Sequence, residues 1–323
     1  MVASSPQTRF ILVFVLMFIG FLQLNAQLDS TRKMPFISAT ADSNTADYQS
    51  FRYRPPFITT LPETIRETSG LLFWDGKLWT HNDSGNLPEI YQVDSMNGNV
   101  LRTVVVRNSL NTDWESITQD DSSIYIGDFG NNTGNRTDLH ILKIAKTDIL
   151  NLTKDTVNAT YIRFSYPYQI HFTSALNKTD FDCEAFFCQN DSLHLFSKNW
   201  ADGQTKHYVL PATAGVYKAR FVESFNADGL ITDAAINAKG HIVLLGYKNT
   251  VRRSYTCFAW LLSGYEGSAF FGGNKTRLEL GSALHLGQSE GIVLKDDDTG
   301  WISSESIHSG WFSEPAKLFG FNF

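Results

Sequence analysis

Short runs of apolar or alternating residues recur throughout the chain and are separated by turns rich in Asp, Asn, Gly and Ser. Examples are SGLLFW at 69–74, EIYQV at 89–93 and HIVLLGY at 241–247. Alternation is typical of half-buried strands, short wholly apolar runs fit buried strands, and the 3.6-residue period of amphipathic helices is almost absent. The pattern therefore predicts an all-β protein.

A weak internal repeat underlies these strands. The segments TSGLL at 68, WESI at 114, CEAF at 183, TDAA at 232 and SEGI at 289 can be aligned, with steps of 46, 69, 49 and 57 residues. Such steps suit units of four strands with their loops. In each segment a polar residue precedes a small one, and the polar column contains Ser69, Glu115, Glu184, Asp233 and Glu290.

Five repeat units predict a five-bladed β-propeller over residues 57–323. Four strands can be drawn in each of the first four units, whereas the fifth unit runs out after three, at Phe323. The segment FITTLPE at 57–63 supplies the missing strand, so an N-terminal strand closes the last blade, as propellers require. A β-sandwich or two barrels would leave this deficit unexplained. A six-bladed propeller is the alternative if the long second unit contains another blade.

The polar column predicts a metal site. The first strand of each blade lines the central channel of a propeller, so the five side chains would point toward one axis. Four carboxylates and a hydroxyl at close range need a cation, and ligands that are all oxygen favour Ca²⁺. Any single Glu at a strand start could instead be a solvated edge charge. The predicted ligands are Ser69, Glu115, Glu184, Asp233 and Glu290.

The loops after the second strands would gather at the same end of the channel. They include HNDSGN at 81–86, GDFGNN at 127–132 and SKNW at 197–200. A cation and basic side chains in one depression would attract an anionic ligand, and Asp83 and Asp128 are candidates for the general base or for further metal ligands. The ordinary alternative is that these loops simply form turns. The candidate substrate-binding residues are His81, Asn131, Arg136, Lys198, Trp200, Lys248 and Glu305, with Arg252 and Arg253 nearby.

The N-terminus matches a secretory signal peptide. Residues 10–24 form an apolar run behind Arg9, and Ala26 offers a cleavage point. We therefore predict a signal peptide at 1–26, a flexible polar lead-in at 27–56, and secretion or release into a periplasm. The run is shorter than a typical membrane span, and an uncleaved anchor helix is the alternative. No stable membrane anchor is expected after cleavage.

The charge, the cysteines and the sequence motifs argue against several classes of function and site. Without residues 1–26 the chain carries 26 basic and 33 acidic residues, a formal charge of −7, which argues against wholesale nucleic-acid binding. Cys183 and Cys188 lie too far apart on one extended strand to form a disulfide, so free thiols are expected. No G-x-S-x-G, H-E-x-x-H or Walker motif is present, so a serine-hydrolase elbow, a zinc site of that kind and a P-loop are not expected.

The polar column and its WES segment resemble the central calcium site of the calcium-activated nucleotidases (apyrases), which are five-bladed propellers. The likeness covers blade spacing over residues 57–323 and a handful of identities, and Asp233 stands where that family tends to have a hydroxyl. It implies the fold and an axial calcium rather than a substrate. HNDSGN, DWESI and YIGDFGNN together are also similar to a set of exported bacterial propeller proteins. Six-bladed calcium lactonases offer a further analogy, because they too hold a metal on the axis.

These features together predict an exported, calcium-dependent hydrolase of a phosphorylated or other anionic small molecule. The Ca²⁺ would polarise a substrate oxygen, Asp83 or Asp128 would act as base, and basic side chains would hold the anion. The alternative from another class is a non-catalytic propeller with a structural metal that captures a glycan or a protein partner. A calcium-dependent lactonase or esterase is the third possibility. The sequence leaves the oligomeric state open.

Overall fold

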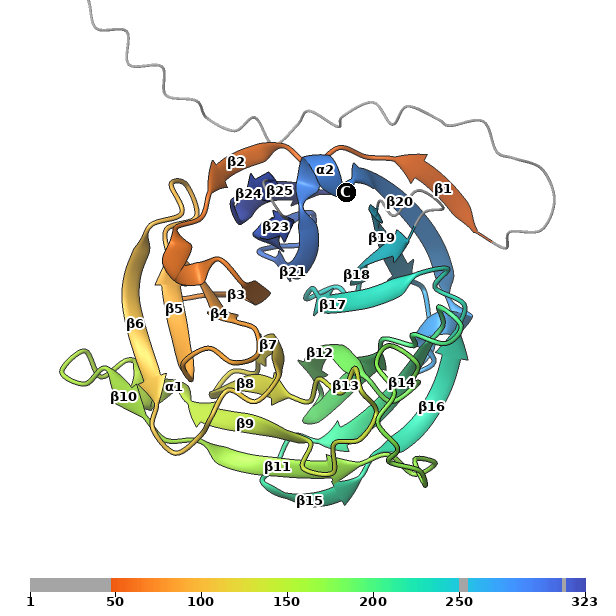
Figure 1. Cartoon of the computed structure of the whole chain (residues 1–323), viewed down its shortest axis with the longest axis horizontal. Coiled ribbons are helices and arrows are strands. Elements are labelled where there is room, and N and C mark those ends of the chain that lie inside the picture. The colour runs from red at the N-terminus through yellow and green to blue at the C-terminus, as the bar shows by residue number, and fades with distance from the viewer. Residues whose placement is uncertain (1–47, 250–254, 310–311) are drawn as a thin grey trace, which may run out of the picture. The chain divides into compact units, whose positions relative to one another are not determined.

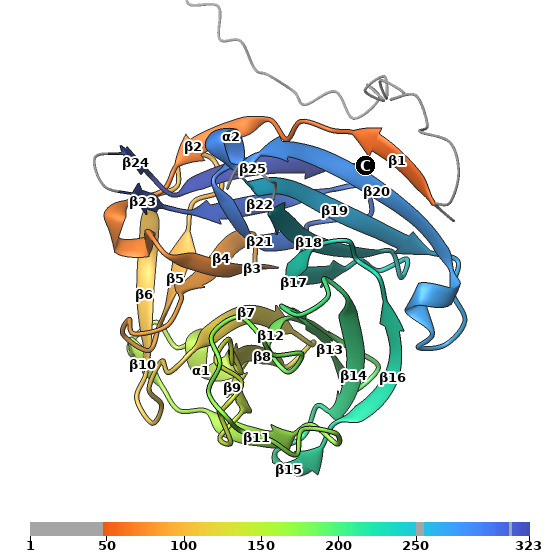
Figure 2. The same cartoon turned by 45° about the vertical axis from the view of Figure 1, so that its right-hand side comes forward.

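The computed structural model describes residues 48–249, 255–309 and 312–323, which all belong to the compact unit Phe36–Phe323. The predicted signal peptide, most of the lead-in, and Arg252 and Arg253 lie outside the described residues. Five sheets are arranged around one axis (Figures 1 and 2). The predictions of an all-β protein and of a five-bladed propeller are therefore confirmed.

Each blade starts at the axis and runs outward through antiparallel strands. Blade 1 contains β3 (Thr68–Trp74), β4 (Lys77–Asn82), β5 (Glu89–Val93) and β6 (Val100–Val106). Blade 2 contains β7 (Trp114–Gln119), β8 (Ser123–Asp128), β9 (His140–Ala145) and β11 (Thr160–Ser165). Blade 3 contains β12 (Cys183–Gln189), β13 (Ser192–Ser197), β14 (Thr205–Pro211) and β16 (Arg220–Phe225).

Blades 4 and 5 complete the ring. Blade 4 contains β17 (Leu230–Ile236), β18 (Ile242–Asn249), β19 (Tyr255–Ser263) and β20 (Asn274–Ser282). Blade 5 contains β21 (Gln288–Leu294), β22 (Thr299–Glu305) and β25 (Lys317–Asn322). Its fourth strand is the N-terminal β2 (Phe57–Thr60), which pairs antiparallel with β25. The predicted closing strand is thus confirmed, although it is shorter than 57–63. The five innermost strands lie side by side, and β21 returns to β3.

Three blades carry an additional strand that runs parallel to their outermost strand. In blades 1 and 2 these are β10 (Thr156–Val157) beside β6 and β15 (Gly215–Lys218) beside β11. In blade 4 it is β1 (Gln49–Arg52) beside β20. Strand β1 corrects the expectation of a flexible lead-in at these four residues. Backbone pairing orders a polar segment whose side chains show no strand period.

The remaining elements are short. They are η1 (Glu63–Ile65), α1 (Lys146–Ile149), η2 (Phe270–Gly272), α2 (Ala283–Leu286) and a hairpin of β23 (Ile307–Ser309) and β24 (Phe312–Glu314). No helix among the described residues has the length and apolar character needed to span a membrane. Cys183, Cys188 and Cys257 are free thiols, as predicted.

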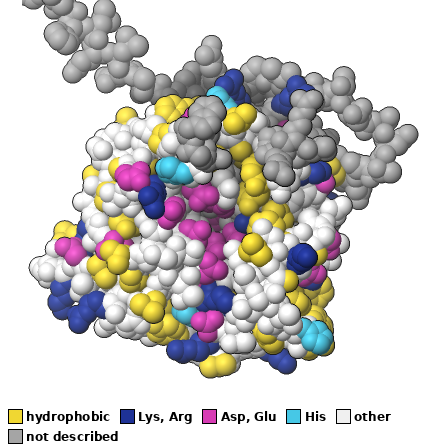
Figure 3. All heavy atoms as spheres, in the orientation of Figure 1, with side chains coloured by type: hydrophobic (Ala, Val, Ile, Leu, Met, Phe, Trp, Pro, Cys, Tyr) yellow, Lys and Arg dark blue, Asp and Glu magenta, His cyan; other side chains and the backbone are white. Residues whose placement is uncertain are grey.

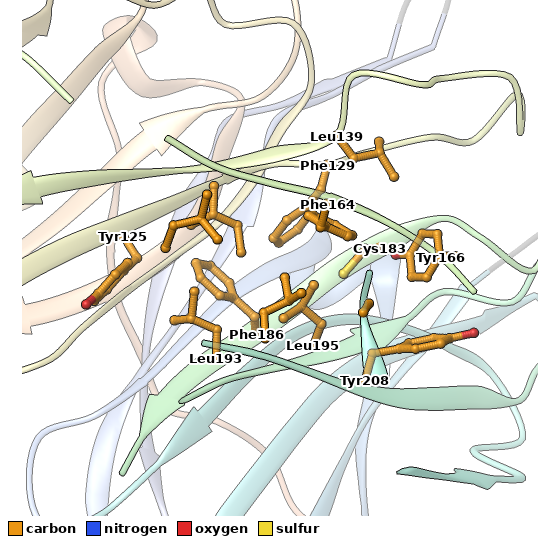
Figure 4. Close-up of a cluster of buried hydrophobic side chains, with 14 of the residues drawn as sticks. Tyr125, Phe129, Leu139, Phe164, Tyr166, Cys183, Phe186, Leu193, Leu195 and Tyr208 are labelled. Atoms are coloured by element: carbon orange, nitrogen blue, oxygen red, sulfur yellow. The ribbon is translucent and has the colours of Figure 1, made fainter. Parts of the chain in front are cut away.

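Apolar side chains fill the spaces between neighbouring blades. The cluster between blades 2 and 3 includes Tyr125 and Phe129 from blade 2 and Phe186 from blade 3 (Figure 4). Phe129 comes from the GDFGNN loop, and its ring meets that of Phe186 edge-on at 5.2 Å. Gly127 makes room for this ring, because a Cβ at that position would lie 2.0 Å from it. The first half of the loop therefore anchors blade 2 to blade 3.

Candidate functional site

The aligned segments lie on the innermost strands, and each strand carries a β-bulge at the motif. In blades 2, 3 and 5 the residue without a cross-strand partner is Glu115, Glu184 or Glu290. A bulge re-aims a side chain out of the regular alternation, and all three carboxylates reach the same end of the channel. In blade 4 the bulge falls on Thr232, one residue before Asp233. The repeat alignment is therefore wrong by one residue in that blade.

The three glutamates line a pocket of about 250 Å³, which we call the axial pocket. Asp and Glu side chains gather near the centre of the face that contains it (Figure 3). Ser69, the predicted column member of blade 1, also lines the pocket, and its hydroxyl donates a hydrogen bond to the backbone oxygen of Glu115 at 2.6 Å. The carboxylates that line the pocket are Asp83, Asp113, Glu115, Glu184, Glu290 and Glu305.

One side of the axial pocket brings Asp83, Asp113 and Glu115 together. One oxygen from each lies within 4.8 Å of the others. Glu115 is only 7% exposed, and no described residue donates a hydrogen bond to its carboxylate. Burial and the Asp83 charge raise the pKa of Asp113 to about 7, and burial and the Glu184 charge raise the pKa of Glu115 well above its usual range. A divalent cation would stabilise the charged forms of all three groups.

The last glycine of GDFG lets two of these carboxylates approach the loop backbone. A Cβ on Gly130 would lie 2.0 Å from Glu115 Oε1 and 2.5 Å from Asp113 Cγ. Any side chain at this position would occupy the space that the carboxylates now fill. The GDFGNN loop thus packs Phe129 into the core and, at Gly130, leaves space for the carboxylates of Glu115 and Asp113.

Gly130→Ala should therefore displace the carboxylates and destabilise the fold by about 1–3 kcal/mol, as overpacking does. Urea unfolding measures this difference. The matched control is Gly272→Ala, because a Cβ there meets no atom within 4 Å. Equal effects of the two substitutions would contradict the close approach of Gly130 to the acidic group.

Lys198 is the one basic side chain that lines the axial pocket in the part of the chain that the structure describes. Its Nζ lies 3.0 Å from Glu184 Oε1, and the ammonium lies over the rings of Trp200 and Tyr247 at 5.0 and 5.2 Å. Burial disfavours the charged amine, but Glu184 and the other nearby charges outweigh it and raise the pKa of Lys198 well above its usual range. Lys198 is therefore a fixed counter-charge for Glu184 and is not free to bind an anion.

The wall that blade 5 forms contains Glu290 and Glu305. Burial raises the pKa of Glu290 to about 7, although Lys198 opposes this shift. Burial and the charge of Glu290 raise the pKa of Glu305 well above its usual range. A carboxyl group with a pKa near neutrality, such as that of Glu290, can both donate and accept protons at physiological pH. This wall can therefore supply general acid or base chemistry.

The sequence prediction missed a second polar column that contains Asp113, Asp182 and Gln288. Each stands two residues before a pocket glutamate, and this spacing in the sequence could have revealed it. Asp182 is fully buried and accepts a hydrogen bond from Trp200 Nε1 at 2.7 Å. Gln288 donates to Glu290 Oε1 at 2.5 Å. The column therefore adds Asp113 and Gln288 to the pocket lining, whereas Asp182 does not line the pocket.

Asp128 and Arg136 lie outside the axial pocket, contrary to their predicted roles as base and anion ligand. Asp128 is fully buried and accepts hydrogen bonds from Arg136 Nη2 at 2.8 Å and from the backbone of Thr112 at 3.2 Å. Arg136 also donates to the backbone oxygen of Gly130 at 2.9 Å. These contacts hold the GDFGNN loop in place. Asp128 and Arg136 therefore hydrogen-bond within the loop region rather than to a substrate in the pocket.

Three other predicted residues also lie outside the pocket. His81 is fully buried, and burial lowers its pKa to about 4. The backbone N–H of Asn131 donates to Asp182 Oδ1 at 2.5 Å, so Asn131 supports the buried column. Lys248 is exposed and pairs with Asp228.

Asp233, the fifth predicted metal ligand, does not line the axial pocket either. Ser116 donates a hydrogen bond to Asp233 Oδ1 at 2.6 Å, and the backbone N–H of Ile292 donates to Oδ2 at 2.7 Å. These contacts tie blade 4 to blades 2 and 5. Both oxygens of Asp233 are therefore used in joining blades.

No protein-family model matches the chain, and no curated protein matches it. Among solved structures, the arabinofuranosidase catalytic domain of Coprinopsis cinerea is 11% identical, with 85% of this chain and 98% of that one covered and a TM-score of 0.47. An arabinofuranosidase of Podospora anserina is also 11% identical, with 83% and 96% covered and a TM-score of 0.43. The hydrazine synthase of Kuenenia stuttgartiensis is 10% identical, with 82% and 76% covered and a TM-score of 0.39. Sequence identities and TM-scores this low, to enzymes that differ so much from one another, imply no activity for this protein.

Proposed function

We propose that this protein is a calcium-dependent hydrolase whose active site is the axial pocket. The observation that carries the proposal is Glu115, a buried carboxylate that faces Asp83 and Asp113 and receives no hydrogen bond from any described residue. Such a group costs free energy unless it is protonated or binds a cation. Oxygen-only ligands favour Ca²⁺ over transition metals, and Ca²⁺ accepts additional water or substrate oxygens.

The proposed ligand set is Asp83, Asp113 and Glu115, in place of the five-residue column. Glu184 is removed from that set because Lys198 neutralises it at 3.0 Å. Asp233 is removed because it does not line the pocket. The Ca²⁺ would act as a Lewis acid toward a substrate oxygen. Proton transfer would fall to the wall of Glu290 and Glu305.

A hydroxyl-rich substrate such as a glycan suits the pocket. Carboxylate acceptors make up much of the lining, which also includes the carboxamides of Asn132 and Gln288 and the indole of Trp200. Sugar hydroxyls donate to such acceptors and sugar rings pack on aromatic faces. A phosphorylated or other anionic small molecule is the second candidate, and the Ca²⁺ itself favours it. Without that cation an anion would meet repulsion, since Lys198 is already paired.

Saturating Ca²⁺ should raise the melting temperature of the EDTA-treated protein by about 5–10 °C, because a ligand at 100 times its dissociation constant adds about 2.7 kcal/mol. Glu115→Gln should abolish this rise, whereas the exposed control Glu266→Gln should keep it. Thermal unfolding with EDTA, then Ca²⁺, Mg²⁺ or Mn²⁺, measures the effect. If no cation stabilises the wild type, the metal site and the catalytic proposal both fail.

Turnover of glycosides, phosphate esters and lactones is then measured for the wild type and the same variants, with and without chelator. We expect turnover of at least one of these substrates, and we expect both EDTA and the Glu115→Gln substitution to abolish it. Calcium stabilisation without turnover of any class would favour the non-catalytic binding propeller. Turnover of lactones alone would favour the esterase alternative.

A further inference from the structure

A second hollow, of about 510 Å³, lies on blade 2 where strands β9, β11 and β15 meet. It is larger than the axial pocket, and the proposed hydrolysis does not use it. We call it the outer groove. Its lining includes His140, Tyr161, Arg163, Val216 and Tyr217, and also the carboxylate of Asp138.

The strand register brings apolar and basic side chains together in the outer groove. Arg163 on β11 is directly opposite His140 on β9 and Val216 on β15, so the three side chains project from one face. Tyr161 stands two residues before Arg163 and shares that face. The guanidinium lies over the Tyr161 ring, 4.6 Å from its centroid, and Val216 is 79% exposed. A cation is thus held against aromatic and aliphatic walls.

The charges around the groove leave Arg163 uncompensated. Its guanidinium makes no hydrogen bond or ion pair with any residue of the described ranges. The nearby carboxylate of Asp138 is committed to Arg136, whose Nε lies 3.0 Å from Oδ1. His140 Nδ1 lies 2.8 Å from the backbone oxygen of Asp138. A guanidinium with unused donors, fixed on a ring, is suited to a bidentate contact with a carboxylate.

We propose that the outer groove is a binding site for a small organic anion that carries a carboxylate on a planar apolar group. The carboxylate meets Arg163, and the apolar group packs against the exposed Val216 beside the guanidinium. The volume of the hollow lies within the range of small-molecule sites. This site is separate from the axial pocket and from the calcium site proposed there.

Calorimetric titration of the full protein with benzoate tests the site, with EDTA present so that no metal can bind the carboxylate. Benzoate should bind the wild type more tightly than neutral benzamide does. Arg163→Gln should weaken benzoate binding roughly tenfold or more, through loss of the charged bidentate contact. Arg220→Gln is the matched control, an exposed arginine that does not line the groove.

Glu115→Gln should leave benzoate binding unchanged, which separates this site from the axial pocket. Arg163 is exposed, so its variant should keep the wild-type melting temperature. The proposal is overturned if benzoate fails to bind at millimolar concentration, if benzamide binds as tightly, or if Arg163→Gln binds benzoate as well as the wild type does.

Discussion

Replacing Lys198 with Met should destabilise the protein by about 3–5 kcal/mol, because it leaves the buried Glu184 carboxylate without its counter-charge. Lys198 and Glu184 are 4% and 6% exposed, and their charged atoms lie 3.0 Å apart. For a domain of this size the melting temperature should fall by about 6–20 °C. Thermal and urea unfolding in EDTA measure the change without interference from bound metal.

The matched control is Lys248→Met, a second lysine, which lies near the end of strand β18 in blade 4. Lys248 forms an exposed pair with Asp228, and such pairs contribute about 1 kcal/mol or less. Adding Glu184→Gln to the Lys198→Met variant should recover much of the stability, since it removes the stranded charge. Similar losses for the two lysine variants, or no recovery in the double variant, would show that Lys198 does not neutralise Glu184.

The ring of blades could be predicted because it depends on patterns that strands impose locally. The spacing of the five aligned segments indicated the number of blades, and the deficit in the last unit identified the closing strand at Phe57–Thr60. Strand β1 could not be predicted in the same way. Its order comes from parallel backbone pairing with β20, and such pairing leaves little trace in side-chain pattern.

The candidate site was predicted only in part because bulges and loops decide where side chains point. Glu115, Glu184 and Glu290 reach the pocket because each is the unpaired residue of a bulge, and the sequence aligns them correctly. Simple alignment put Asp233 in the same column, yet the bulge of blade 4 falls one residue earlier. Asp128 has the right position in the chain for a base, but the loop turns it toward Arg136.

Replacing Asp233 with Asn should remove a pH-dependent cost of folding. Burial raises the pKa of Asp233 to about 8, although hydrogen bonds from Ser116 and the backbone of Ile292 oppose this shift. In the unfolded chain the pKa of an Asp is about 3.9. At pH values between these two pKa values, Asp233 therefore keeps its proton in the native state and has lost it in the unfolded state. The free energy of unfolding of the wild type should fall there by about 1.4 kcal/mol per pH unit from this group.

Asn reproduces the protonated acid, because its amide can donate toward Ser116 while its oxygen accepts from Ile292, but it cannot release a proton. The free energy of unfolding of Asp233→Asn, minus that of the wild type, should therefore increase by about 1.4 kcal/mol for each pH unit as the pH rises from about 4 to about 8. Above about pH 8 the difference should stay constant. Urea unfolding at a series of pH values in EDTA measures this difference. The exposed control Asp121→Asn should run parallel to the wild type. A parallel curve for Asp233→Asn as well would mean that Asp233 stays ionised among the strands, held by its hydrogen bonds alone.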